Sequence, residues 1–166
     1  LKGSDLYVVP QEGLQDKGLR YYFKETIKLD KGKIYISELD LNKEKGGIET
    51  PHKPMLRYAM PAFGREKQVQ GIVVLNVLAV YLLKNILTHE HPKGPDLYLL
   101  SKDGYYLQHP EISKRWGDLN NLNTGENVKN DLPQETVSLM LSSQSGNKLV
   151  NNQFFNFIPI YFDPSD

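Results

Sequence analysis

Arg20 and Tyr22 are the two residues of this chain whose types and spacing most directly suggest binding chemistry. The guanidinium of arginine presents a planar fork of N–H donors that matches a carboxylate or a phosphate. A tyrosine two positions away adds an aromatic wall and a hydroxyl group. The pair therefore predicts a corner that binds an anion, although a surface arginine beside a core tyrosine is the commoner use of these two residues.

Further polar residues stand where apolar strands are expected. Asn76 interrupts the longest apolar run of the chain, and Arg57 lies between two apolar residues. A polar group that is buried in a strand must find hydrogen-bond partners, so each is either a satisfied core residue or a donor that lines a pocket. Glu38 and Asp40 could serve as a general acid and base, but two carboxylates near a loop are more often solvated.

Motifs for other chemistries are missing or incomplete. The chain has no phosphate-binding glycine loop, no nucleophile elbow and no cysteine, which excludes a thiolate zinc site and a disulfide framework. Ser145 and Lys148 match an S-x-x-K pattern without the rest of that motif set. His89 and His91 could ligate a metal, but a solvated linker explains them better because a four-coordinate site needs more ligands. We therefore expect no catalytic residues, no metal and no cofactor.

The composition narrows the class of protein. The chain has 166 residues, enough for one ordinary domain or two small ones. Its 20 basic residues balance its 20 acidic residues, which argues against nucleic acid as a partner and against a polybasic membrane-surface module. The longest apolar run, residues 72–83, is too short to span a bilayer. No signal peptide opens the chain, so we expect any membrane anchor to lie outside it.

Local patterns in the first half predict, among other elements, a helix and a hairpin. Apolar residues spaced i, i+3, i+4 and i+8 indicate a helix over residues 17–29. Alternating and β-branched residues predict a hairpin of strands 55–60 and 68–77, with Pro61 ending the first strand. The polar residues 41–54 between helix and hairpin indicate a loop.

The second half begins after a polar segment, residues 85–95, which is typical of a linker. Asp103 and Gly104 stand between two apolar runs and predict a tight hairpin in which both turn residues take a positive φ. Asp131 is expected to cap a helix that follows it, and residues 154–162 predict a final strand. Hairpins without regular βαβ units favour an α+β fold with antiparallel sheets.

Several segments of the chain, in order, resemble one known family. In the first half they are Leu14–Lys17, Arg20–Phe23, Ile34–Asn42, Pro54–Pro61 and Gly71–Asn76. In the second half they are Asp103–Leu107, Pro110 and Trp116–Gly117. Together they resemble double Cache domains, which are PAS-like extracytoplasmic sensors of bacterial histidine kinases, diguanylate cyclases and chemoreceptors. The resemblance covers most of the chain.

The resemblance implies two tandem PAS-like modules, each an antiparallel sheet flanked by helices. Residues 1–88 would form the membrane-distal module and residues 89–166 the membrane-proximal one. The family's N-terminal helix and first distal strands have no counterpart in this sequence, so the distal module is expected to lack them.

The resemblance also implies a ligand site in the distal module. In the amino-acid-binding subfamily an arginine and aromatic residues hold the ligand carboxylate, and Arg20 and Tyr22 fall at those positions. An aspartate that holds the ligand amine is replaced here by Asn76, which carries no charge. The expected ligand is therefore a small polar molecule or a carboxylate, including amino-acid-like ones. The full set of expected ligand-binding residues is Arg20, Tyr22, Tyr35, Ser37, Asp40, Arg57 and Asn76.

The favoured interpretation is a non-enzymatic sensor on the periplasmic or extracellular side of a membrane-anchored receptor. Its parent protein would carry a kinase or cyclase output domain, and a homodimer of the full receptor is left open. One alternative is a docking module for another protein, in which the pocket is vestigial. The third choice, a small hydrolase or isomerase, is disfavoured because no nucleophile stands beside a base.

Overall fold

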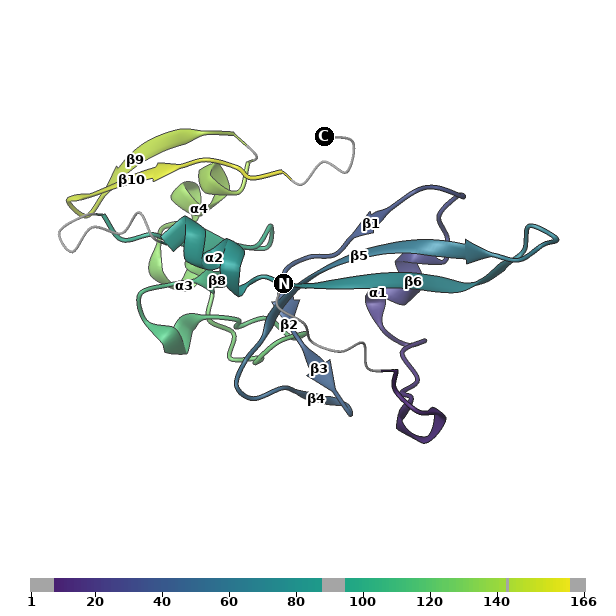
Figure 1. Cartoon of the computed structure of the whole chain (residues 1–166). Helices are drawn as coiled ribbons and strands as arrows, with labels where there is room; N and C mark the ends of the chain where they lie inside the picture. The colour runs from purple at the N-terminus through teal and green to yellow at the C-terminus, as the bar shows by residue number, and fades with distance from the viewer. Residues whose placement is uncertain (1–7, 88–94, 143, 162–166) are drawn as a thin grey trace.

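The structure is a computed structural model that describes residues 8–87, 95–142 and 144–161. Its first half, residues 8–87, holds six strands, two α-helices and one turn of 3₁₀ helix (Figure 1). These elements are η1 (Gln11–Gly13), α1 (Tyr21–Thr26), β1 (Tyr35–Ile36), β2 (Asp40–Leu41), β3 (Lys43–Glu44), β4 (Gly47–Ile48), β5 (Pro54–Phe63), β6 (Val69–Leu78) and α2 (Val80–Leu87).

One antiparallel sheet dominates this half, with β5 at its centre. β6 pairs with β5 along its whole length, while the short strands β1 and β2 share the other edge of β5. The predicted hairpin is therefore confirmed, but its first strand does not end at Pro61. The Arg57 carbonyl accepts a hydrogen bond from the Ser37 backbone, so odd positions of β5 point their backbone groups toward β1. Pro61 lies beyond the end of β1, where its missing N–H leaves no ladder bond unmade.

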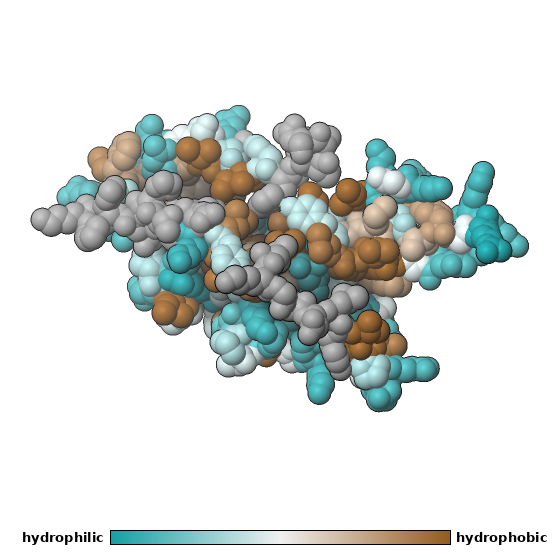
Figure 2. Space-filling view, in the orientation of Figure 1, coloured by the Kyte–Doolittle hydropathy of each residue, from teal (hydrophilic) through white to brown (hydrophobic). Residues whose placement is uncertain are grey.

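The two faces of this sheet differ in how they are covered. Helix α1 packs against β5 and β1 on the face that carries Arg57. The opposite face is open along the hairpin, and it appears as a hydrophobic surface in the space-filling view (Figure 2). We call this the apolar sheet face, and its exposed members are Met60, Val73, Leu75 and Val77.

Two segments of the first half differ from the sequence-based expectation. The predicted helix over residues 17–29 is shorter, because α1 covers only Tyr21–Thr26 and turns flank it. The expected loop over residues 41–54 contains a small hairpin of β3 and β4. Its turn uses Lys45 and Gly46, both at positive φ, and the Gln15 side chain accepts a hydrogen bond from the backbone of Lys45 at 2.9 Å.

The second half is built from short elements around two small hairpins. They are β7 (Leu99–Leu100), β8 (Tyr106–Gln108), η2 (Ile112–Lys114), α3 (Val128–Asp131), α4 (Gln134–Met140), β9 (Gly146–Val150) and β10 (Gln153–Phe157). All strand pairings described in both halves are antiparallel, so the predicted mixed fold with antiparallel sheets is confirmed.

The β7–β8 turn departs from its predicted geometry. Of its two central residues only Gly104 takes a positive φ, 85°, and Asp103 does not. Gly104 is buried, and a Cβ there would lie 3.0 Å from side-chain atoms of both Asn127 and Val128. A glycine is required at this position both for its backbone conformation and for the space beside it.

The expected cap of the last helix is wrong. Asp131 ends α3 instead, and α4 begins after Pro133 without a side-chain cap. The Asp131 carboxylate accepts hydrogen bonds from Lys114 at 2.5 Å and from the Tyr106 hydroxyl at 2.7 Å. This carboxylate therefore binds side chains from other elements and does not cap α4.

These contacts predict an acid-dependent contribution to stability. Burial favours the neutral acid, but the hydrogen bonds from Lys114 and Tyr106 outweigh it and hold the pKa of Asp131 below its ordinary value. Because the pKa of Asp131 is lower in the folded state, its ionised form stabilises the fold. This contribution to the free energy of unfolding is complete above the pKa of the unfolded state, about 3.9, and is lost as the pH falls through the pKa of the folded state. We expect Asp131→Asn to destabilise the protein at neutral pH, with a gap that narrows as the pH falls from about 5 toward 2. Urea titrations across that range measure the gap, and a pH-independent gap would contradict the prediction.

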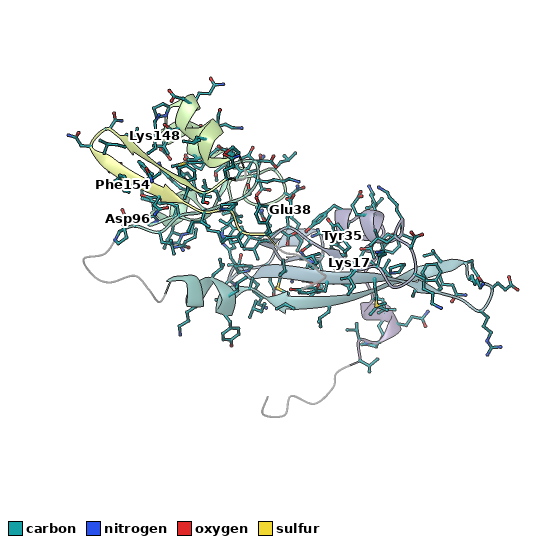
Figure 3. All side chains as sticks on the ribbon, turned by 90° about the horizontal axis from the view of Figure 1, so that it is seen from above. Lys17, Tyr35, Glu38, Asp96, Lys148 and Phe154 are labelled. Carbon is teal, nitrogen blue, oxygen red and sulfur yellow. The ribbon has the colours of Figure 1, made fainter. Side chains whose placement is uncertain are left out.

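The two halves share one buried apolar cluster, which we call the junction core. Its buried members are Leu41, Leu83, Leu107 and Trp116. The backbone N–H of Leu41 donates to the Asn121 side chain at 2.7 Å, a contact between residues 80 positions apart. Glu38, which Figure 3 labels, forms an ion pair with Lys102 at 2.5 Å across the same junction. The halves are thus joined by packing as well as by the chain.

The predicted boundary between two modules falls largely on residues 88–94, outside the described residues. The main sheet ends at Leu78, and the described strands after residue 95 belong to separate sheets. Because the junction core belongs to both halves, the division into modules 1–88 and 89–166 stays a prediction.

Candidate ligand-binding site

A buried ion pair lies at the centre of the site. Arg57, in the middle of β5, is only 2% exposed, and its Nη1 contacts Asp40 Oδ1. Asp40 reaches it because β2 pairs with the start of β5, which places Asp40 opposite Met55. The Tyr21 hydroxyl, from α1, donates to the other carboxylate oxygen of Asp40 at 2.8 Å. Both oxygens of this carboxylate are therefore held by side chains from neighbouring elements.

The protonation of this cluster follows from burial and charge. Burial raises the pKa of the Tyr21 phenol well above its ordinary value, and the negative charge of Asp40 raises it further. Burial opposes the charge on Arg57, but its hydrogen bond and ion pair with Asp40 outweigh burial and raise its pKa. Tyr21 is thus a neutral donor and Arg57 a permanent cation at physiological pH.

Two guanidiniums lie over the same tyrosine ring. Arg57 Cζ is 5.0 Å from the centre of the Tyr22 ring, and Arg20 Cζ is 5.7 Å from it. Tyr22 is buried, and a cation over an aromatic face at these distances is attracted by the ring. Within the described residues, Arg57 has Asp40 as counter-charge, whereas the Arg20 side chain has only this ring contact. The site therefore carries one cation more than its protein carboxylates balance.

The Ser37 side chain forms hydrogen bonds with the backbone of the sheet. Its hydroxyl donates to the Glu38 carbonyl at 2.7 Å and accepts from the Arg57 backbone N–H at 2.9 Å. These bonds extend the β1 ladder by one residue and fix the backbone of Arg57. The hydroxyl hydrogen is engaged in this arrangement, so Ser37 acts on the site by positioning Arg57.

Tyr35 and Asn76 share the sheet face of Arg57. Tyr35 lies opposite Ala59, two residues along β5, and Asn76 lies directly opposite Arg57 in the register of β6. Tyr35, labelled in Figure 3, is half-buried, and burial raises its pKa. Asn76 is exposed, so it is not a satisfied core asparagine. Both side chains lie on the face that α1 covers in part.

The structure brings most of the expected site residues together. Arg20, Tyr22, Asp40 and Arg57 form one chain of ion-pair and ring contacts, and Ser37 joins it through the backbone. Sequence reasoning missed Tyr21, because the helical pattern assigned Tyr22 to the buried face and left its neighbour unexplained. It also missed Asn42, whose side-chain oxygen lies 3.4 Å from Arg57 Nη2.

The described parts of the chain contain no cluster of side chains that could bind a metal ion. Within residues 8–87, 95–142 and 144–161, no three histidine, aspartate or glutamate side chains gather in a way that could hold an ion. His89 and His91 lie outside the described residues.

A family model and several solved structures match the chain. Residues 5–166 match the model of the bacterial histidine kinase sensor domain. A domain of a Vibrio parahaemolyticus protein assigned to the sensory box/GGDEF family shares 30% sequence identity with a TM-score of 0.74, over 89% of this chain and 55% of that one. No curated protein matches the chain at a significant level.

Two further solved structures extend the comparison. The extracellular domain of the histidine kinase vpHK1S-Z8 shares 28% identity with a TM-score of 0.72, over 89% of this chain and 52% of that one. The periplasmic sensory domain of the Campylobacter jejuni chemoreceptor Tlp1, at 23% identity and a TM-score of 0.52 over 78% and 44% of the two chains, shares the fold. The chain spans about half the length of these solved structures.

Proposed function

Because this chain belongs to the family of bacterial histidine kinase sensor domains, we propose that it is the extracytoplasmic ligand-sensing part of a membrane-anchored signalling receptor. A sensor domain of this family is not itself a catalyst. The extracellular position of the vpHK1S-Z8 domain supports the proposed location. No helix within the described residues is long and apolar enough to cross a bilayer, and the proposed membrane anchor belongs to the parent receptor.

We further propose that a small carboxylate or other small polar ligand binds over Tyr22. The observation that carries this proposal is the pair of guanidiniums on one ring, of which Arg57 alone has a carboxylate partner among the residues that the structure describes. A ligand carboxylate would supply the missing counter-charge to Arg20 in a bidentate fork. Asn76 and Tyr35, on the same sheet face, would offer neutral hydrogen bonds to the rest of the ligand.

Docking of a partner protein is the second candidate function. The apolar sheet face favours it, because Leu75 is 63% exposed and Val73 is 59% exposed at alternate positions on one face of β6. A thermal-shift screen separates the two candidates. A small ligand at one hundred times its Kd raises the free energy of unfolding by about 2.7 kcal/mol, whereas a docking module shows no response to small molecules. The screen would use dicarboxylates, short monocarboxylates and the amino acids.

Replacing Arg20 is the sharpest test of the proposed site. We expect Arg20→Ala to weaken the binding of a carboxylate hit by about 10- to 100-fold, since a charge-assisted pair contributes about 1.5–3 kcal/mol. Arg20→Lys should also weaken binding, because a point charge does not reproduce the fork. Lys24→Ala, on the exposed face of the same helix, is the matched control. Unchanged affinity in Arg20→Ala, with the fold intact by circular dichroism, would contradict the proposed site.

A further inference from the structure

A groove separate from the Tyr22 site lies between the two halves of the molecule. It has a volume of about 510 Å³ and runs between α2 and the segment that follows β8, two elements that lie side by side in Figure 1. Its floor is apolar and buried, and is formed by Leu83 from α2 with Leu107 and Trp116 from the second half. Ligand pockets in proteins range from about 300 to 1,000 Å³ and combine an apolar lining with a few polar groups.

The rim of this groove is basic. Lys84, Arg115 and His52 line it, and none of the described residues that line it is an aspartate or a glutamate. Lys84 follows Leu83 on α2, so the cation lies beside the apolar floor. The Arg115 guanidinium is held in place because its Nε donates to the His109 carbonyl at 2.7 Å. Its position at the rim is therefore fixed before any ligand arrives.

The floor residue Trp116 has an unusual backbone conformation. Its φ is 63°, in the left-handed region that bulky residues rarely adopt. It is held there by hydrogen bonds to Tyr106 and Leu122, at 2.7 and 2.9 Å. Strained conformations that the surroundings enforce gather at ligand-binding positions. Trp116 both lines the groove and belongs to the junction core.

We infer that this groove is a second ligand site, which binds a small amphipathic carboxylate. The acyl chain of the ligand lies on Leu83, Leu107 and Trp116, and its carboxylate meets the basic rim at Lys84 and Arg115. A buried apolar floor with Lys84 and Arg115 at its rim, and with no carboxylate among its described lining residues, is complementary to this chemistry in both shape and charge. The inference does not rest on the Tyr22 site, since the two sites share no residue.

Trp116 is the single tryptophan of the chain, so its fluorescence reports on this groove directly. Titration with octanoate is expected to change the Trp116 emission in a saturable way. Butyrate, whose chain is too short to cover the floor, and octyltrimethylammonium, whose charge is opposite, are expected to bind at least about tenfold more weakly. A response equal for all three compounds, or no saturable response to octanoate, would overturn the inference.

Variants of two residues that line the groove test where octanoate binds. Lys84→Glu is expected to raise the Kd for octanoate by at least about tenfold, while Lys24→Glu, an exposed lysine on α1, leaves it unchanged. Ile112→Asp, at a 76% exposed position that lines the groove, removes apolar contact without disturbing a buried side chain and should weaken binding as well.

Arg20→Ala separates this groove from the proposed sensor site. If the Arg20→Ala variant still binds octanoate, the result supports octanoate binding in the groove, whether or not the Tyr22 site binds a ligand. Octanoate binding that is lost in Arg20→Ala and retained in Lys84→Glu would place the ligand at the Tyr22 site and overturn the inference.

Discussion

Replacing Asp40 with alanine is expected to lower the free energy of unfolding by about 3–5 kcal/mol. The change leaves Arg57, which is 2% exposed, as a buried cation without a counter-charge, and it removes the acceptor of the Tyr21 hydroxyl. A domain of this size has only about 5–15 kcal/mol of stability in total. The variant should therefore be partly unfolded near physiological temperature, which a urea or thermal titration followed by circular dichroism measures.

Two further variants test whether the loss of stability in Asp40→Ala comes from the unpaired charge of Arg57. Glu25→Ala breaks the exposed ion pair with Lys28 and should change stability by less than about 1 kcal/mol. The double variant Asp40→Leu with Arg57→Met replaces both charges by apolar groups and should recover most of the loss. If Asp40→Ala costs no more than Glu25→Ala, the buried pair does not have the energetic role we assign to it.

The second large effect is expected at Leu41, the centre of the junction core. Leu41 is fully buried, with 0% exposure. Its truncation to alanine should cost about 2–5 kcal/mol, because the cavity lies between segments that are fixed by their own hydrogen bonds. Since Trp116 belongs to the same cluster, the tryptophan emission of the variant should shift to the red as water reaches the ring.

Leu119→Ala is the matched control for this prediction. Leu119 is 76% exposed, and its truncation should change stability by less than about 0.5 kcal/mol and leave the Trp116 emission in place. A small effect of Leu41→Ala on both readouts would mean that the two halves hold their structures independently.

The sequence predicted the parts of the fold that depend on near neighbours. The β5–β6 hairpin follows from alternation on both sides of a short turn, and the β7–β8 hairpin follows from Gly104. The residues 41–54 have few apolar side chains, so the β3–β4 pairing there, fixed by turn geometry at Lys45 and Gly46, gave no hydrophobic pattern to detect.

The central contacts of the site depend on residues that are brought together only by the fold. The family resemblance predicts both Arg57 and Asp40 as ligand-binding residues, but no pattern in the sequence predicts that they form an ion pair with each other. Their pairing depends on β2 meeting the start of β5, a register that no local pattern encodes. The predicted capping role of Asp131 was wrong for the same reason, because its partners Tyr106 and Lys114 lie in β8 and η2, which precede it in the sequence. In both places tertiary contacts of a charged group override the local preference.

The outer edge of β6 has a consequence for the behaviour of the protein in solution. Within the described residues β6 pairs with β5 alone, and it carries no charged side chain from Val69 to Leu78. A long strand with unpaired backbone groups, no charge and no proline is a template on which another molecule can add its own strand. We therefore expect this edge to be one place where molecules can associate by strand addition, a process that rises with protein concentration because it joins separate chains.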